Sequence, residues 1–541
     1  MKLVTVKQMR EIESEANAAG FSYDQMMANA GMGLAQEVKN LGLKLDKQVI
    51  LGLVGPGNNG GDTLVALTHL AREGWSSHAY LIDRKKDNLV TQLINTGGGV
   101  LDAAADGNHK NMADLLKESG VLLDGVLGTG IRLPLKQEIG NVLNAAKETL
   151  SKLSQPPIVV AVDCPSGVDC DTGEVAKESL RADVTVTMAA VKLGMVQLPA
   201  FEVVGELVVV DLGFPHKLKA LEKITTEVAD RAMIKSILPS RPADAHKGTF
   251  GTIMIAAGST NYTGAALLAG KAAYRSGAGL VTLAIPASMH TAIAGQFPEA
   301  TWILLPHQQG VIAREAAEVL SKNLDRATAL LVGPGFGTET TTREFIEKLL
   351  SGQTANRRPG SRIGFVHETE QVKEAGDQSL PPLVFDADGL KLLANIKDWH
   401  KLLPLHSILT PHPGEMSVLT GLAKEEIQAS RSKIAMTYST DWGHVVVLKG
   451  ALTIVADPDG RSSVIPVATA ALARAGSGDV LAGVIVGLLG QGLEPYQAAV
   501  AGAWIHGQAG MVAQEELGSS ATVMAGDILD SIPDVYYELS F

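Results

Sequence analysis

Short apolar runs rich in β-branched residues alternate with helix-length amphipathic segments through the first part of the chain. The runs QVILGLV, SSHAYLI, VLLDGVL, PIVVAVD, ADVTVTM and GELVVVDLG follow one another between positions 48 and 213. Strands separated by segments of helical length predict βαβ units and a parallel sheet. Two helices are expected before the first strand, over residues 5–18 and 23–41.

The same rhythm starts again in the second part, with FGTIMIAAG, GLVTLAI, ALLVGPG, PLVFDAD, SILTPHP, HVVVLKG and LTIVADP. A second parallel sheet is therefore expected, and 541 residues exceed what one ordinary core needs. A charged connector with a proline near its end follows Pro215. These features predict a first domain over 1–215, a linker over 216–232 and a second domain over 233–541. The polar, turn-rich stretch between Gly352 and Pro382 predicts a surface loop or insert.

The composition of the chain disfavours some classes of binding partner. The net charge of -12 opposes non-specific attraction to nucleic acid or an anionic membrane. The N-terminus lacks the apolar core of an export signal, and the longest apolar stretch, Val480 to Leu489, is too short to cross a bilayer. We expect a cytoplasmic homo-oligomer that acts on small molecules. Cys164 and Cys170 match neither a Cys-x-x-Cys pair nor a metal cluster, which favours incidental small residues.

A glycine-rich loop lies between the first strand and the next helix, in VILGLVGPGNNGGDTLVALTHLAREG. Free amides at a helix start cradle anions, and glycines let the backbone approach phosphate. Gly55, Gly57 and Gly60 match the G-x-G-x-x-G motif of dinucleotide-binding proteins, so a dehydrogenase is one alternative. The polar side chains of Asn58 to Asp62 weaken that alternative, because a plain pyrophosphate cradle does not need them.

Polar residues also end later strands of the first domain. Asp124 ends one strand before the loop Gly128 to Gly130, and Asp163 and Ser166 follow another. Each acid alone is more often a turn former or helix cap. Their arrival at successive strand ends instead predicts a ligand site at the carboxyl edge of the sheet. Oxygen ligands of this kind suit an alkali or alkaline-earth cation.

In the second domain the strongest local signal is ARAGSGDVLAGVIVGLLGQGL. Gly476, Ser477 and Gly478 precede Asp479 at the start of an apolar helix, which is an arrangement suited to phosphoryl transfer. The alternative is a helix cap with glycines in a turn. Lys449 joins two short strands that suit a wall for a nucleotide, and His412 is held rigidly between two prolines.

The motifs GPGNNGGD, LLDGVLGTG, VVAVDCPSGVD and ADVTVTMAAVKLG together resemble the NAD(P)HX epimerase family, which acts on hydrated NADH and NADPH, across residues 1–215. The resemblance implies a Rossmann-like three-layer αβα domain and a potassium ion held by Asn59, Asp124 and Ser166. It implies contacts with the hydrated dinucleotide by Asn58, Asn59, Gly60, Gly61, Asp62, Gly128, Thr129, Gly130, Ile131, Arg132, Leu133, Pro134 and Asp163.

Inverting the carbon that bears the added hydroxyl needs a proton donor and acceptor near the ring. Asp163 is the expected acid/base group. Lys192 is a second candidate, for electrostatic help, and its alternative is a solvated surface lysine. Thr63 stands where many members of the family carry glycine.

The motifs HKGTFGTIMIAAGSTNYTGAALLAGKAAYRSGAGLV, VGPGFG, FDADGL, TPHPGEMSVLTG, LKGALTIV and AGSGD resemble the ADP- or ATP-dependent NAD(P)HX dehydratases, a branch of the ribokinase-like αβα fold. The resemblance implies that the hydrated nucleotide contacts Ala265, Gly335, His412 and Asp479. It implies that the adenine nucleotide contacts Lys449, Gly450, Ala451, Leu452, Thr453 and Gly478. Asp479 is the expected base, Mg²⁺ is expected on the phosphates, and the fusion of domains favours ADP over ATP.

Two other functions stay open at this point. The second domain could be a ribokinase-like small-molecule kinase that the first domain regulates. The chain could also be an interaction scaffold built on a decayed epimerase domain, against which the intact Asn59, Asp124, Asp163 and Ser166 speak.

Overall fold

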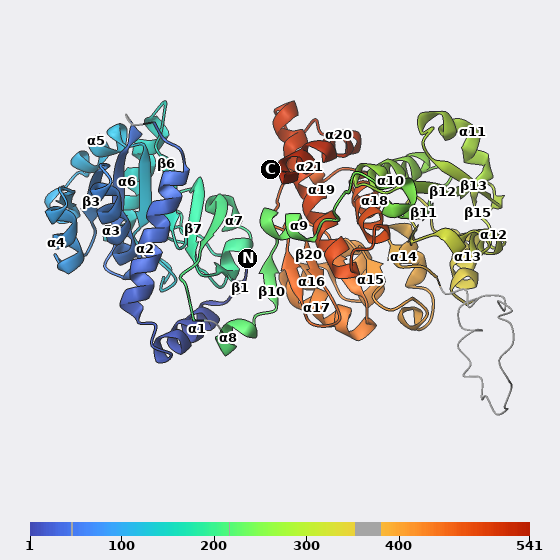
Figure 1. Ribbon diagram of the computed structural model, residues 1–541, viewed down its shortest axis with the longest axis horizontal. Coiled ribbons are helices and arrows are strands. Elements are labelled where there is room, and N and C mark those ends of the chain that lie inside the picture. The colour runs from blue at the N-terminus through green and yellow to red at the C-terminus, as the bar shows by residue number, and fades with distance from the viewer. Residues whose placement is uncertain (45–46, 216, 352–379, 541) are drawn as a thin grey trace. The chain divides into compact units, whose positions relative to one another are not determined.

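The computed structural model describes residues 1–44, 47–215, 217–351 and 380–540. Most of the expected insert between Gly352 and Pro382 lies outside these residues. The chain forms two compact units, Met1–Val228 and Ala229–Phe541 (Figure 1). The division falls within the stretch 216–232 that was expected to be a linker. Residues up to 228 join the first unit because the backbone amides of Lys219 and Ala220 donate to the Glu15 carboxylate, and Lys2 pairs with Glu227.

The first unit contains a seven-stranded sheet of order β4-β3-β2-β5-β6-β7-β9, in which every pairing is parallel. Its strands are β2 (Val49–Val54), β3 (Ser76–Leu81), β4 (Gly99–Asp102), β5 (Val121–Gly125), β6 (Ile158–Val162), β7 (Val184–Met188) and β9 (Glu206–Val210). A separate parallel pair joins β1 (Leu3–Val4) to β8 (Val191–Lys192). The parallel sheet that the sequence predicted is confirmed.

Helices cover both faces of this sheet, which makes three layers. One face packs against α1 (Val6–Ala18), α2 (Tyr23–Asn40), α3 (Asn58–Arg72) and α4 (Asn88–Asn95), and the other against α5 (Lys110–Glu118) and α6 (Gln137–Lys152). Two short helices, α7 (Phe201–Val204) and α8 (Lys219–Glu222), and the strand β10 (Thr226–Val228) follow later in the unit. Both helices expected before the first strand are present.

The second unit contains a larger sheet, whose order runs β21-β20-β19-β18-β17-β16-β11-β12-β13. The strands are β11 (Thr252–Ala256), β12 (Leu280–Pro286), β13 (Thr301–Leu305), β16 (Ala329–Val332), β17 (Leu383–Phe385), β18 (Ile408–Leu409), β19 (Val445–Leu448), β20 (Ile454–Ala456) and β21 (Ser462–Val464). The sheet is parallel except at its β19-β20-β21 edge, which is antiparallel. A small hairpin joins β14 (His307–Gln308) to β15 (Val311–Ile312).

This sheet is also covered on both faces. One face packs against α9 (Arg231–Ile237), α10 (Thr263–Arg275), α11 (His290–Ile293), α18 (Ser477–Gly490), α19 (Pro495–Leu517), α20 (Ala525–Asp530) and α21 (Ile532–Ser540). The other packs against α12 (Ala316–Ser321), α13 (Thr340–Ser351) and α14 (Asp388–Leu393). Three further helices, α15 (Pro413–Thr420), α16 (Lys424–Ala429) and α17 (Arg431–Trp442), lie between β18 and β19 in the chain.

The apolar stretch Val480 to Leu489 forms the body of α18, and all of its residues are buried. It is therefore a core helix. A Cβ at Gly483 would lie 2.3 Å from the carbonyl oxygen of Ala269, so α18 and α10 pack with their backbones close together. This tight packing holds the first turn of α18 in place, and Asp479 with it. None of the helices in the described ranges combines the length and hydropathy needed to cross a bilayer.

Candidate active sites

The first unit has a cavity of about 630 Å³ at the carboxyl ends of its central strands. The expected site residues that line it are Asn58, Asn59, Asp62, Gly128, Thr129, Gly130, Asp163 and Lys192. Gly60 and Gly61 belong to the first turn of α3 behind this lining. Ile131, Arg132, Leu133 and Pro134 continue the Gly128 loop, but the lining stops at Gly130. The strand ends therefore converge as the parallel topology predicts.

The glycine-rich loop is tight because backbone atoms fill the space where side chains would stand. A Cβ at Gly55 would lie 1.8 Å from the carbonyl oxygen of Val126, and one at Gly60 would lie 2.0 Å from the carbonyl oxygen of Gly55. The helix α3 begins after Gly57 with no side-chain cap, so its first-turn amides are not occupied by a capping side chain. Thr63 fits the loop, since its hydroxyl donates to the carbonyl oxygen of Asn59 at 2.7 Å.

Asp163 stands at the end of β6 with a left-handed backbone, φ 64. Its Oδ1 accepts hydrogen bonds from the ammonium of Lys192, from the Thr187 hydroxyl at 3.2 Å and from the Met188 amide at 3.1 Å. Lys192 is 1% exposed, so the solvated surface alternative for this lysine is wrong. It is buried because its strand β8 pairs with β1 at the core of the unit. The ion pair holds Asp163 as a hydrogen-bonded carboxylate beside the cavity.

Three further carboxyl groups line the same cavity, Glu13 of α1, Asp24 of α2 and Asp62 of α3. Burial, and then the charge of Asp163, raise the pKa of Asp62 well above its usual value. The same two causes raise the pKa of Glu13, although Lys192 and Arg10 oppose them. Glu13 was not among the residues predicted from the sequence. Its position on the apolar side of an amphipathic helix, with Met9 and Ala16, is the signal that points to it.

The three residues expected to hold potassium lie close together beneath the Gly128 loop. The Ser166 amide donates to Oδ2 of Asp124 at 2.8 Å, while Oδ1 of Asp124 is buried and has no hydrogen-bond partner among the described residues. The side-chain nitrogen of Asn59 donates hydrogen bonds to the carbonyl oxygens of Leu127 and Val162. The side-chain oxygen of Asn59 takes no part in these two bonds and can act as a ligand. Burial raises the pKa of Asp124. A buried anionic oxygen without a partner fits a hard cation.

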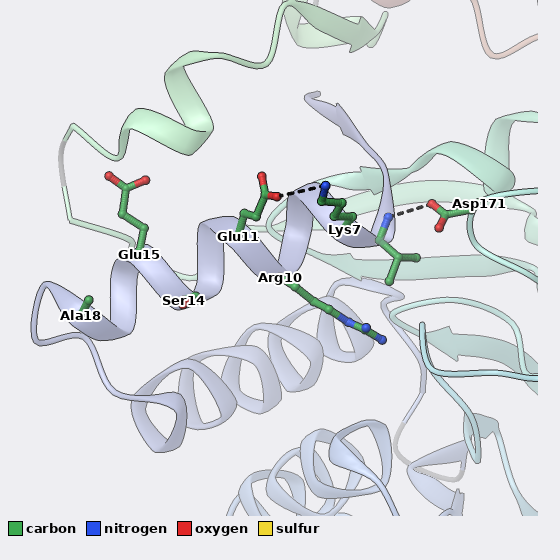
Figure 2. Close-up of a pocket in the computed structure, with 8 residues that line it drawn as sticks. Lys7, Arg10, Glu11, Ser14, Glu15, Ala18 and Asp171 are labelled. Atoms are coloured by element: carbon green, nitrogen blue, oxygen red, sulfur yellow. Dashed lines mark hydrogen bonds and ion pairs between the residues drawn. The ribbon is translucent and has the colours of Figure 1, made fainter.

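A hollow of about 590 Å³ runs along the outer side of α1 (Figure 2). Some of its polar residues are engaged with one another or with the backbone: Lys7 approaches Glu11 at 3.9 Å, and Asp171 accepts from the Val6 amide at 2.8 Å. None of the residues predicted from strand ends or motifs lines this hollow. The chemistry of the first unit therefore belongs to the larger cavity.

The second unit has a cavity of about 430 Å³ beside the start of α18. It is lined by His412, Lys449, Gly450, Ala451, Thr453 and Gly478 from the predicted set, and also by Arg474, Ser477 and His506. Leu452 is buried behind this wall. Ala265 and Gly335 do not line this cavity but lie against each other, because a Cβ at Gly335 would be 2.8 Å from that of Ala265. Asp479 adjoins the lining residue Gly478.

The start of α18 is open, and Asp479 is not its cap. Gly476 is the N-cap residue with a left-handed φ of 87, and no side chain caps the helix, so the helix-cap alternative for Asp479 is wrong. Burial raises the pKa of Asp479 to about 7, and Asp386 adds to this effect while Lys449 opposes it. The carboxyl group therefore titrates near neutral pH beside free helix amides.

A chain of ion pairs supports this turn. Lys449 donates to Oδ1 of Asp386 at 2.7 Å and lies 3.6 Å from Oε2 of Glu415, while Glu415 in turn lies 3.4 Å from His412. Burial alone lowers the pKa of Lys449, but Asp386 and Glu415 raise it above its usual value. The other oxygen of Asp386 is buried and has no partner within the described ranges. Lys449 is thus a fixed cation at the wall of the cavity.

His506 of α19 was not predicted from the sequence. Its Nε2 lies 3.0 Å from the hydroxyl of Ser477, and burial lowers the pKa of His506 to about 4, so the ring is neutral. The contact orients the first residue of α18. The histidine lies within the long helix, where no local motif marks it.

These observations define a two-domain α/β protein with one cavity at the edge of each sheet. Residues 253–357 and 362–534 match the NAD(P)H-hydrate dehydratase family, and residues 23–194 match the YjeF-related protein N-terminus. The bifunctional NAD(P)H-hydrate repair enzyme Nnr of Moorella thermoacetica is 35% identical over 100% of this chain and 97% of its own length. The enzyme of the same name from Salinibacter ruber is 33% identical over 95% and 92%.

The chain belongs to the family of bifunctional NAD(P)H-hydrate repair enzymes. Among solved structures, the ADP/ATP-dependent NAD(P)H-hydrate dehydratase of Bacillus subtilis, co-crystallised with ATP and Mg²⁺, is 28% identical with a TM-score of 0.47. That similarity covers 58% of this chain and 98% of the other.

Proposed function

We propose that this chain repairs hydrated NADH and NADPH. Its first domain interconverts the R and S forms, and its second domain dehydrates the S form with ADP, or with ATP, as the phosphate donor. The observation that carries the proposal is that both halves match this family together, while Asp163 lines the first cavity and Asp479 adjoins the lining of the second. Repair of a nicotinamide cofactor agrees with the expected cytoplasmic setting.

In the first domain, the open amides and side chains of Asn58 to Asp62 and the Gly128 to Pro134 loop hold the hydrated dinucleotide. Asp163 is the acid/base group for the inversion of the carbon that bears the added hydroxyl, and Lys192 orients Asp163 through its hydrogen bond. Asn59, Asp124 and Ser166 would hold K⁺, which would supply positive charge close to the dinucleotide phosphates. The unpartnered oxygen of Asp124 supports this assignment.

In the second domain, Asp479 takes the proton from the ring hydroxyl, whose oxygen attacks the terminal phosphorus of the nucleotide. A new O–P bond forms as the nucleotide's bridging oxygen leaves, so ADP becomes AMP. The carbon–oxygen bond of the ring then breaks, inorganic phosphate departs, and loss of a ring proton restores the dihydronicotinamide. The ring nitrogen's lone pair assists this elimination.

The nucleotide lies against Lys449 to Thr453 and Gly478 in this proposal, with the substrate at Ala265, Gly335 and His412. The lining of the second cavity supports the nucleotide assignment. Mg²⁺ bound to the phosphates would neutralise charge during transfer. Lys449 and the open amides of α18 stabilise the oxygens of the transferring phosphoryl group.

A mixture of R and S hydrated NADH, supplied with ADP or ATP, tests both activities. Recovery of all the NADH absorbance is expected for the natural chain. Asp163→Asn should stop recovery at the S fraction, and Asp479→Asn should recover none. Recovery of only the S fraction by the natural chain would remove the epimerase proposal, and transfer of phosphate to sugars or vitamins would favour the kinase alternative.

A further inference from the structure

Glu13 occupies a position where an amphipathic helix normally carries an apolar residue. It lies on the core-facing side of α1, four residues after Met9 and three before Ala16, and both of these are buried. A carboxylate at such a position loses hydration unless a partner replaces it. In the described part of the chain, no hydrogen bond or ion pair engages the Glu13 side chain. The fold therefore keeps this carboxyl group facing the cavity without using it for stability.

The charged groups that line the cavity with Glu13 come from its own helix and from four other elements. The cavity lining includes Arg10 of α1, Asp24 of α2, Asp62 of α3, Asp163 after β6 and Lys192 of β8. The lysine is committed to Asp163 by a hydrogen bond and to Thr187 at 2.9 Å. One buried ammonium thus faces the carboxyl groups of Asp62, Asp163 and Glu13. Neighbouring carboxyl groups favour retention of a proton, because like charges disfavour ionisation, and at Glu13 burial and Asp163 outweigh the opposing charges of Lys192 and Arg10.

These contacts distinguish Asp163 from the other two carboxyl groups. Burial and the neighbouring Asp163 raise the pKa of both Glu13 and Asp62. Asp163, by contrast, accepts three hydrogen bonds on one oxygen, as an ionised carboxylate does. The cavity therefore offers a hydrogen-bonded acceptor, Asp163, and two carboxyl groups whose surroundings favour the protonated form. Of these two carboxyl groups, Glu13 is the less buried.

We propose that Glu13 donates the proton to the ring hydroxyl during epimerisation, as the counterpart of Asp163. The inference rests on the proposed epimerase function. The Glu13 proton moves to the hydroxyl oxygen, the carbon–oxygen bond breaks, and the lone pair of the ring nitrogen forms an iminium as water leaves. Water then adds to the other face of that carbon, the iminium electrons return to nitrogen, and Asp163 accepts the proton of the added water. Solvent restores both protonation states.

Purified R epimer, incubated with the full chain without nucleotide, provides the test, with conversion to the S epimer followed by chromatography. Glu13→Gln should lower kcat about 10²–10⁴-fold with little change in KM, which is the usual worth of a general acid. Glu13→Asp should restore part of the rate. Glu11→Gln is the matched control, because Glu11 lies on the outer side of the same helix beside Lys7 (Figure 2). It should keep the natural rate.

A pH profile separates proton donation from a structural role. The kcat of the natural chain should fall at high pH as Glu13 loses its proton, and Glu13→Gln should lack this limb. If the natural chain epimerises and Glu13→Gln keeps its rate and its alkaline limb, the inference is wrong while the proposed function stands. That result would assign the donor to Asp62. If the natural chain fails to epimerise but dehydrates the S form, the epimerase proposal itself fails.

Discussion

Replacing Asp479 by asparagine is expected to stabilise the second domain while it abolishes dehydration. Asp479 lies in the first turn of α18, where burial and the charge of Asp386 raise its pKa from 3.8 to about 7 in spite of Lys449. A group that must be deprotonated to act as a base is thus held in surroundings that disfavour its charge. Asparagine keeps the shape of the side chain and removes the charge.

The magnitude follows from the difference in pKa between the folded and unfolded chain. The values 3.8 and about 7 differ by about three pH units, and each unit is worth about 1.36 kcal/mol. Ionised Asp479 therefore lowers the free energy of unfolding by about 4 kcal/mol relative to a neutral side chain. This loss of stability is absent below pH 3.8, grows as the pH rises and is complete above about pH 7. The reason is that Asp479 ionises at lower pH in the unfolded chain than in the folded chain.

Urea unfolding followed by tryptophan fluorescence measures this effect, since Trp302, Trp399, Trp442 and Trp504 lie in the second unit. Asp479→Asn should unfold at higher urea than the natural chain above pH 7 and at nearly the same urea near the ordinary pKa of an aspartate. Asp441→Asn serves as the control, because Asp441 is exposed. An equal gain at both pH values, or none at high pH, would refute the reasoning about charge and burial.

Three further outcomes are expected. Lys192→Met should destabilise the first domain by about 3–5 kcal/mol, because it leaves the Asp163 carboxylate without its buried cation, and thermal melting at neutral pH would measure this. Gly55→Ala should cost about 1–3 kcal/mol, since its Cβ would meet the carbonyl oxygen of Val126 at 1.8 Å, and it should weaken binding of the dinucleotide in calorimetry. Asp124→Asn should remove any dependence of epimerisation on K⁺ while dehydration of the S form continues, and an unchanged K⁺ response would exclude this site.

Much of the fold could be predicted because parallel strands buried on both faces read as continuous apolar runs. Several of the strands that escaped prediction are short or polar, although β13, which reads Thr-Trp-Ile-Leu-Leu, is neither. β4 is four residues long, and β21 reads Ser-Ser-Val. Their strand character comes from pairing with longer neighbours rather than from their own sequence. A pattern read along the chain does not contain that information.

The candidate site residues also differ in how far the sequence predicts them. Asp124, Asp163 and Ser166 were predictable, because ends of adjacent parallel strands meet at one edge of the sheet. Glu13 and His506 were not, since each reaches its cavity from a helix whose placement depends on packing far away in the sequence. Ala265 and Gly335, which the motif resemblance assigns to the hydrated substrate, lie against each other outside the lining of the second cavity, so their assignment stays a prediction.

The two cavities share one electrostatic arrangement. In each, a buried lysine pairs with one carboxylate, Lys192 with Asp163 and Lys449 with Asp386, and a further carboxyl group stands nearby with a raised pKa. One ammonium offsets only one buried negative charge, so the additional carboxyl group must hold its proton or accept the cost of ionising. In the first cavity the paired carboxylate is the proposed base. In the second cavity the proposed base is Asp479, which is not paired with the lysine. The proposed base is therefore the lysine's partner in the first cavity and a carboxyl group outside that pair in the second, and only the folded chain determines which carboxyl group each lysine reaches.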